Sequence, residues 1–177
     1  MNFLKRPFGL SKTPKQGIKD EIPDLEKLLS SEDLNGSVIG LDNYISAFCD
    51  YGDSLDKLSN SQKTFFFNQN LEREINNGGF NQFYFNSAGD FAHETIESLK
   101  AIGAHKTAEI VKKANDQFPK GIVPSDRAVR QELLEKIEIK ANEFWDELDQ
   151  KFFEYEEDLN SLNMEYVRKN KNQFEIK

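Results

Sequence analysis

The chain has few of the residues that most often carry chemistry in a small protein. Among its 177 residues there are one Cys, two His and one Trp. Because Cys49 is alone, no intrachain disulfide and no thiolate metal cluster can form. Its place in the pattern Tyr44-Ile45-x-x-Phe48-Cys49 instead favours a thiol buried in the core.

Long apolar runs are also lacking. The longest runs contain only a few residues, so no segment is long enough to cross a membrane as a helix. Lys5 and Arg6 near the N-terminus are not followed by the apolar stretch of a secretory signal. Together with the single cysteine, these features predict a protein of the reducing cytoplasm that has no membrane partner.

Motifs for catalysis, cofactors and metals are missing as well. There is no Gly-x-x-x-x-Gly-Lys-Ser/Thr loop, no Gly-x-Gly-x-x-Gly turn and no serine in a nucleophile elbow. His93-Glu94 is not followed by the second histidine of a zinc protease motif. Asp90, three residues before His93, is better explained as a helix cap than as a metal ligand. We therefore expect no enzyme, no catalytic residue, no metal and no cofactor.

Acidic residues, in contrast, are abundant. The chain carries 31 Asp and Glu against 23 Lys and Arg, which gives a formal net charge of −8. Such a charge disfavours direct binding to nucleic acid and favours a basic protein partner. Residues 1–19 are the exception, with five basic residues, no acid and two prolines that interrupt any helix. We predict a basic N-terminal arm over residues 1–35, followed by a domain over residues 36–177.

The hydrophobic periodicity predicts an all-α protein, a single compact domain of five or six helices. The expected helices begin near residues 38, 61, 90, 104 and 126, and the second of them ends at Asn77. The last is a long amphipathic C-terminal helix, because apolar side chains recur every three or four residues along it. This stripe comprises Leu134, Ile137, Ala141, Phe144, Trp145, Leu148, Phe152, Tyr155, Leu159, Leu162 and Tyr166.

Residues 76–90 have an unusual composition. They are too aromatic for an ordinary loop and too rich in glycine and amides for an ordinary helix. A double glycine precedes four aromatic residues that lie within six positions. We expect the helix to end here, with Gly78 or Gly79 at positive φ and the aromatic rings in the core. A mainly structural corner is thus predicted, formed by Asn77, Gly78, Gly79, Phe80, Gln82, Phe83 and Asn86.

An acidic run near the C-terminus is the main candidate for a binding surface. Residues 132–158 contain eleven acids and three lysines, and their net charge of −8 equals that of the whole chain. As a helix this run extends about 40 Å, with one carboxylate per about 3.7 Å, close to the phosphate spacing of about 3.4 Å along one DNA strand. Imitating a duplex would require a second acidic surface, from a homodimer or from another face of the chain. The predicted partner-binding acids are Glu143, Asp146, Glu147, Asp149, Glu154, Glu156, Glu157 and Asp158.

Five segments carry a recognisable pattern: residues 71–87 with the Asn-Gly-Gly-Phe motif, 99–104, 124–127, 148–153 and 166–170. They resemble a bacterial domain-of-unknown-function family that is named for its DNA-mimic protein. The resemblance covers about residues 40–175. It implies an all-α fold and an acidic dimer that imitates duplex DNA and occupies the DNA-binding face of a helix-turn-helix transcription factor. The partner-binding acids named above come from the charge pattern and not from the family.

Two functions remain open at this point. The first is a DNA mimic that inhibits a basic DNA-binding protein or transcriptional regulator without binding nucleic acid itself. The second is a small protein-binding or immunity-type module that uses the corner at residues 76–90, with the acids serving only solubility. A contiguous acidic surface would favour the first function. Exposure of Asn77, Asn81, Gln82 and Asn86 around a pocket would favour the second.

Overall fold

The computed structural model describes residues 23–175, apart from the side chain of Glu138, and this part of the chain contains helices and no strand. The α-helices are α1 (Leu25–Ser30), α2 (Leu34–Phe48), α3 (Asn60–Phe85), α4 (Ala92–Ile102), α5 (His105–Asn115), α6 (Arg127–Phe153) and α7 (Leu159–Lys169). Short 3₁₀ helices are η1 (Asp50–Gly52), η2 (Leu55–Lys57), η3 (Ser87–Phe91), η4 (Pro119–Gly121) and η5 (Lys171–Gln173). The all-α prediction is confirmed for the described residues, although their seven α-helices exceed the five or six expected. None of these helices is both long and apolar enough to cross a membrane.

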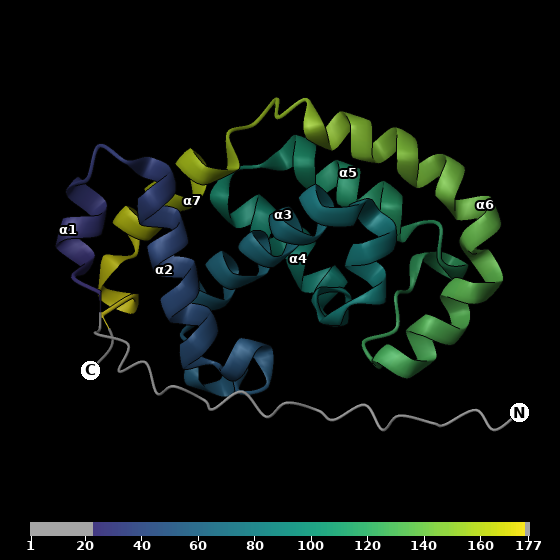
Figure 1. Cartoon of the computed structure of the whole chain (residues 1–177), viewed down its shortest axis with the longest axis horizontal. Coiled ribbons are helices and arrows are strands. Elements are labelled where there is room, and N and C mark those ends of the chain that lie inside the picture. Colours follow the sequence, from purple (N-terminus) through teal and green to yellow (C-terminus); the bar gives the residue numbers. More distant parts are fainter. Residues whose placement is uncertain (1–22, 176–177) are drawn as a thin grey trace, which may run out of the picture.

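Helix α3 runs through the middle of the molecule and connects two hydrophobic clusters (Figure 1). Its first half contributes Phe65 and Phe66 to a cluster with α2 and α7. Its second half contributes Phe80, Phe83 and Tyr84 to a larger cluster with α4, α5 and α6. Helix α6 lies along the outer edge of the molecule, on the side away from α1 and α2 (Figure 1). Among the described residues of this helix, Glu135, Glu143 and Glu147 are exposed.

The double glycine bends α3 between its two halves. Gly78 is extended, with φ −171°, and Gly79 has φ +70° and ψ −170°. A Cβ atom on Gly79 would lie 2.1 Å from Oδ2 of Asp149, so both the backbone angles and the space require glycine. The prediction of a positive φ at this corner is confirmed, and Gly79 is the residue that has it. The helix resumes at Phe80. Phe80, Phe83 and Tyr84 are buried in the core as expected, whereas Phe85 is 54% exposed, so its expected place in the core is wrong.

The long C-terminal helix ends earlier than the sequence predicts. Helix α6 stops at Phe153 and α7 starts at Leu159, so the apolar stripe that reaches Tyr166 spans two helices. Tyr155 has φ +46°, which breaks the helix. Asp158 then accepts a hydrogen bond from the Ser161 amide at 3.0 Å and begins α7 as its N-cap.

Along the apolar stripe of α6, the expected burial is confirmed at Trp145 and Leu148 but not at Phe144. Trp145 and Leu148 are 1% and 2% exposed, and the Trp145 indole nitrogen donates to the Ala114 carbonyl at 3.1 Å. Phe144, in contrast, is 37% exposed, so its expected place on the buried face is wrong. One residue along a helix is a rotation of about 100°, which turns Phe144 away from the core that holds Trp145.

Asp90 does not cap a helix as expected. Helix α4 begins at Ala92 without a side-chain cap, and Asp90 lies in η3. Its carboxylate accepts hydrogen bonds from Arg127 at 2.9 Å and from Arg130 at 2.5 Å. The Arg130 side chain is fully buried and also donates to the carbonyls of Tyr84, Asn86, Pro124 and Ser125. This arginine therefore fixes the start of α6 to the aromatic corner.

The expected basic arm falls largely on residues 1–22, which lie outside the described residues. Residues 23–35 include α1 and the start of α2. Leu25, Leu28 and Leu29 of α1 pack, partly buried, against the cluster of α2 and α7. The predicted boundary between an arm and a domain at residue 35 stays a prediction.

Candidate functional site

Four of the predicted partner-binding acids form one open surface, which we call the α6 strip: Glu143, Asp146, Glu147 and Glu154. All four are exposed, and none makes a hydrogen bond or ion pair within residues 23–175. Spacings of three and four residues place Glu143, Asp146 and Glu147 on one side of α6, with Glu154 following as the C-cap of the helix. From Glu143 to Glu154 the strip extends about 16 Å at 1.5 Å per residue. Between Glu143 and Glu154 the sequence has one basic residue, Lys151.

The other four predicted acids hold the chain's own structure together. Asp149 accepts a hydrogen bond from the Phe80 amide at 2.9 Å, at the point where α3 resumes after its bend. Glu156 pairs with Lys106 at 2.6 Å. Glu157 and Asp158 accept backbone hydrogen bonds at the starts of α5 and α7. The free acidic surface thus has four carboxylates over about 16 Å, where one DNA strand has about five phosphates.

Three of the acids on this side have pKa values shifted from their ordinary range. Burial raises the pKa of Asp149 to about 6, and the nearby charge of Asp146 adds to this rise. Burial would also raise the pKa of Glu157, but hydrogen bonds from the Thr107 and Lys106 amides outweigh it and lower the pKa. The pKa of Asp158 is lowered by the Ser161 hydroxyl and amide. Glu157 and Asp158 are therefore stabilised as carboxylates, whereas Asp149 is not.

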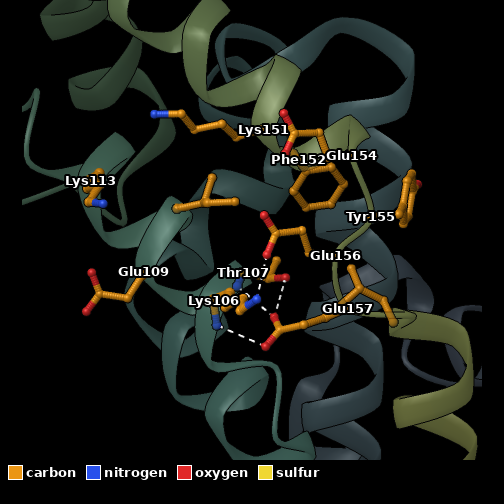
Figure 2. A pocket seen from close by; sticks show the side chains of 12 residues that line it. Lys106, Thr107, Glu109, Lys113, Lys151, Phe152, Glu154, Tyr155, Glu156 and Glu157 are labelled. Atoms are coloured by element: carbon orange, nitrogen blue, oxygen red, sulfur yellow. Dashed lines mark hydrogen bonds and ion pairs between the residues drawn. The ribbon is translucent and has the colours of Figure 1, made fainter.

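The linker between α6 and α7 closes one end of a cavity of about 370 Å³, the linker cavity (Figure 2). Phe152 and Leu159 are buried and Ile110 is partly buried, and these three give the cavity an apolar lining. Figure 2 shows the Glu157 carboxylate against the start of α5, where it accepts from the Thr107 amide and hydroxyl at 2.8 Å each. Charged side chains of both signs stand around the cavity, namely Lys106, Glu109, Lys113, Lys151, Glu154, Glu156 and Glu157.

Most side chains of the aromatic corner pack or bond within the described chain. The rings of Phe80, Phe83 and Tyr84 are fully buried, and the Tyr84 ring lies 5.0 Å from that of Trp145. Side-chain amides of the corner are engaged within the chain: those of Gln82 and Asn86 each donate to Glu74 Oε2 at 2.8 Å, and that of Asn81 donates to Asn142 at 3.0 Å. Asn77 is exposed.

The structure brings the corner and the acidic helix together at one place, which sequence reasoning missed. A second cavity of about 450 Å³, the kink cavity, lies between the bend in α3 and the second half of α6. Its lining residues are Ile75, Asn76, Asn77, Gly78, Gly79, Asp146, Asp149, Gln150 and Phe153. The sequence offers one signal for this arrangement, the double glycine, since a residue without Cβ permits close approach of another element. Among the described residues, no group of three or more His, Cys, Asp and Glu side chains could hold a metal ion.

Comparison with protein-family models matches residues 56–170 to the family described as DMP19-like protein. The match covers more than half of the 177 residues. The chain belongs to the DMP19-like protein family. The resemblance drawn from the sequence is therefore confirmed at the level of the family, although the match begins later than the expected residue 40. The α6 strip and both cavities of this DMP19-like protein lie within the matched range. Comparison with curated proteins and with solved structures found no match.

Proposed function

We propose that this DMP19-like protein is a DNA mimic whose α6 strip binds the DNA-contacting face of a basic protein, a helix-turn-helix transcription factor being one candidate. The observation that carries the proposal is the strip itself: four exposed carboxylates on α6 and its C-cap, without an ion pair among the described residues. Membership of a family named for a DNA mimic supports the same function. A partner whose DNA-binding face is occupied could not bind its operator, so the effect would be inhibition.

The charge pattern is better suited to binding than to stability. Glu143 and Glu147 are like charges at i,i+4, an arrangement that weakens a helix by a few tenths of a kcal/mol. A helix optimised for stability would have lysine between such acids, and the stretch from 143 to 150 has none. Unpaired surface charge accelerates association with a partner of opposite sign. Because one strip approaches the charge of one DNA strand only, we propose that two copies of the chain together present the duplex.

The first experiment tests whether the strip binds. Immobilised full-length protein captures basic proteins from the native host, and a salt gradient elutes them for identification. Glu143→Lys, Glu147→Lys and Glu154→Lys are then combined, and we expect this triple variant to lose the partner while keeping its helical circular dichroism. The control combines Glu32→Lys, Asp56→Lys and Glu94→Lys, three exposed acids outside α6, which make the same change in net charge.

Salt dependence gives a second readout of the same experiment. Screening acts within about 10 Å at 0.1 M ionic strength, so contacts between exposed charges weaken steeply at several times that concentration. We expect the association rate to fall more than the lifetime of the complex shortens. If the triple variant binds the partner as tightly as the control variant does, the DNA-mimic function is refuted.

A second candidate function is a small protein-binding or immunity-type module that uses the aromatic corner. The exposed Asn77 at the kink cavity favours it. The hydrogen bonds of Gln82 and Asn86 to Glu74 argue against it, because they leave fewer free amides for a partner. This function predicts that Asn77→Ala weakens partner binding while the triple variant of the strip does not.

A further inference from the structure

The kink cavity is open to solvent. Its volume of about 450 Å³ lies within the range of small-molecule sites in proteins, roughly 300–1,000 Å³. Ile75 and Gly79 at its base are buried, and Asp149 beside them is half-buried. The lining side chains that are exposed come from both helices and comprise Asn76, Asn77, Asp146, Gln150 and Phe153.

The Asp149 carboxylate is only partly satisfied by the chain. Its Oδ1 atom accepts from the Phe80 amide at 2.9 Å. Its Oδ2 atom has no hydrogen-bond partner among the described residues, and it lies over Gly79, where a Cβ would approach it to 2.1 Å. Asp146, one turn earlier on α6, adds a second carboxylate to the same cavity. The base of the cavity therefore carries negative charge that nothing in the described chain neutralises.

The absence of basic residues distinguishes the kink cavity from the linker cavity. Lys106, Lys113 and Lys151 line the linker cavity and offset its acids, whereas no Lys or Arg is among the nine residues that line the kink cavity. Phe153, which is 42% exposed, also lines the kink cavity. Two carboxylates and an open aromatic ring are groups that attract a cation.

We propose that the kink cavity binds the guanidinium group of an arginine side chain of the partner. The inference rests on the proposed function only for the source of this arginine, a basic protein. A guanidinium group is planar, donates hydrogen bonds in a fork that fits carboxylates and stacks on aromatic rings, whereas the ammonium of lysine is a compact point charge. Asp146 and Asp149 accept its hydrogen bonds, Phe153 packs against its plane, and Asn77 and Gln150 bind the backbone beside it.

The test uses N-acetyl-arginine amide as the probe and the full chain labelled with ¹⁵N. In a two-dimensional ¹H–¹⁵N titration we expect saturable shifts at the amides of residues 76–79 and 146–153. N-acetyl-lysine amide, with the same charge, should bind at least about tenfold more weakly, since it lacks the planar fork. Equal binding of the two probes, or shifts that do not saturate, would overturn the inference.

Matched variants separate the cavity from the general acidity of the protein. Asp149→Asn removes the charge but keeps an oxygen that can accept from the Phe80 amide, so the bend in α3 should persist. Phe153→Leu removes the aromatic ring at a surface position. Each is expected to weaken binding of the arginine probe several-fold. Glu135→Gln makes the same change in charge on α6 about 20 Å from Asp149 and should leave binding unchanged. If Asp149→Asn and Glu135→Gln bind the probe equally, the cavity is not the site.

Failure of this inference and failure of the proposed function give different results. If the arginine probe does not bind but the triple variant of the α6 strip loses the partner, the kink cavity is not a site and the DNA-mimic function stands. If the probe saturates the cavity but the triple variant keeps the partner, the cavity is an arginine site and the α6 strip is not the mimic surface. Asp146 belongs to both the α6 strip and the kink cavity, but the triple variant leaves it unchanged and Glu143, Glu147 and Glu154 do not line the cavity, so the two experiments can be told apart.

Discussion

Replacing Arg130 in α6 should be strongly destabilising, because its charged side chain is buried and bonded to the corner. The guanidinium is fully buried, bonds to Asp90 at 2.5 Å and donates to backbone carbonyls on both sides of the corner, among them those of Tyr84 at 2.6 Å and Pro124 at 2.7 Å. Arg130→Ala removes these hydrogen bonds, and among the described residues Asp90 keeps only its bond to Arg127. Removing one partner of a buried ion pair costs about 3–5 kcal/mol. For a chain of this size, this corresponds to a decrease in Tm of roughly 6–20 °C.

Arg127→Ala is the matched control, since Arg127 bonds to the same Asp90 carboxylate at 2.9 Å from a half-exposed position. Exposed ion pairs contribute about 0–1 kcal/mol, so this variant should be close to wild type. Urea unfolding followed by circular dichroism gives the free energy of unfolding of both variants. If the two substitutions cost the same, within about 1 kcal/mol, Arg130 does not fix α6 to the corner, and that explanation of the fold is refuted.

Three further predictions concern stability. Trp145→Ala should lower the free energy of unfolding by about 3–5 kcal/mol in the same urea assay, because the ring is 1% exposed, and a loss below about 1 kcal/mol would contradict its place in the core. Gly79→Ala should lower the Tm more than Gly103→Ala in thermal melts. Both glycines have positive φ, but of the two only Gly79 has an atom, Asp149 Oδ2, in the space that a Cβ would take. Glu157→Gln should remove part of the acid sensitivity of folding. The pKa of Glu157 is lowered in the folded state, so this carboxylate stabilises the fold above the unfolded pKa of 4.5. That stabilisation is lost as the pH falls through the folded pKa. Unfolding curves at several pH values would test this, and identical pH profiles of variant and wild type would refute it.

The sequence was sufficient for the helical class and for the main apolar faces, because these depend on local periodicity. It could not show where α6 ends: Leu159, Leu162 and Tyr166 continue the three- and four-residue spacing across the linker that separates α6 from α7. A capping signal at Asp158, with Ser161 three residues later, was the one local sign of the new helix.

Only part of the candidate site could be predicted, because the sequence shows which residues are charged but not which groups their side chains contact. Asp149 meets the Phe80 amide 69 positions away, and Glu157 meets Thr107 50 positions away. No local pattern reveals such pairs, so these acids were grouped with those that remain free. The same limit explains Asp90, whose partner Arg130 lies 40 positions along the chain.

The central claim is that the α6 strip and duplex DNA compete for one surface of the partner. Once the partner is identified, its complex with labelled operator DNA is titrated with the full chain at low salt. We predict that the wild-type protein displaces the DNA and that the triple variant of Glu143, Glu147 and Glu154 does not. The control variant of Glu32, Asp56 and Glu94 should displace the DNA as well as the wild type does. A ternary complex of partner, DNA and this protein, with no displacement of DNA at saturation, would contradict the claim.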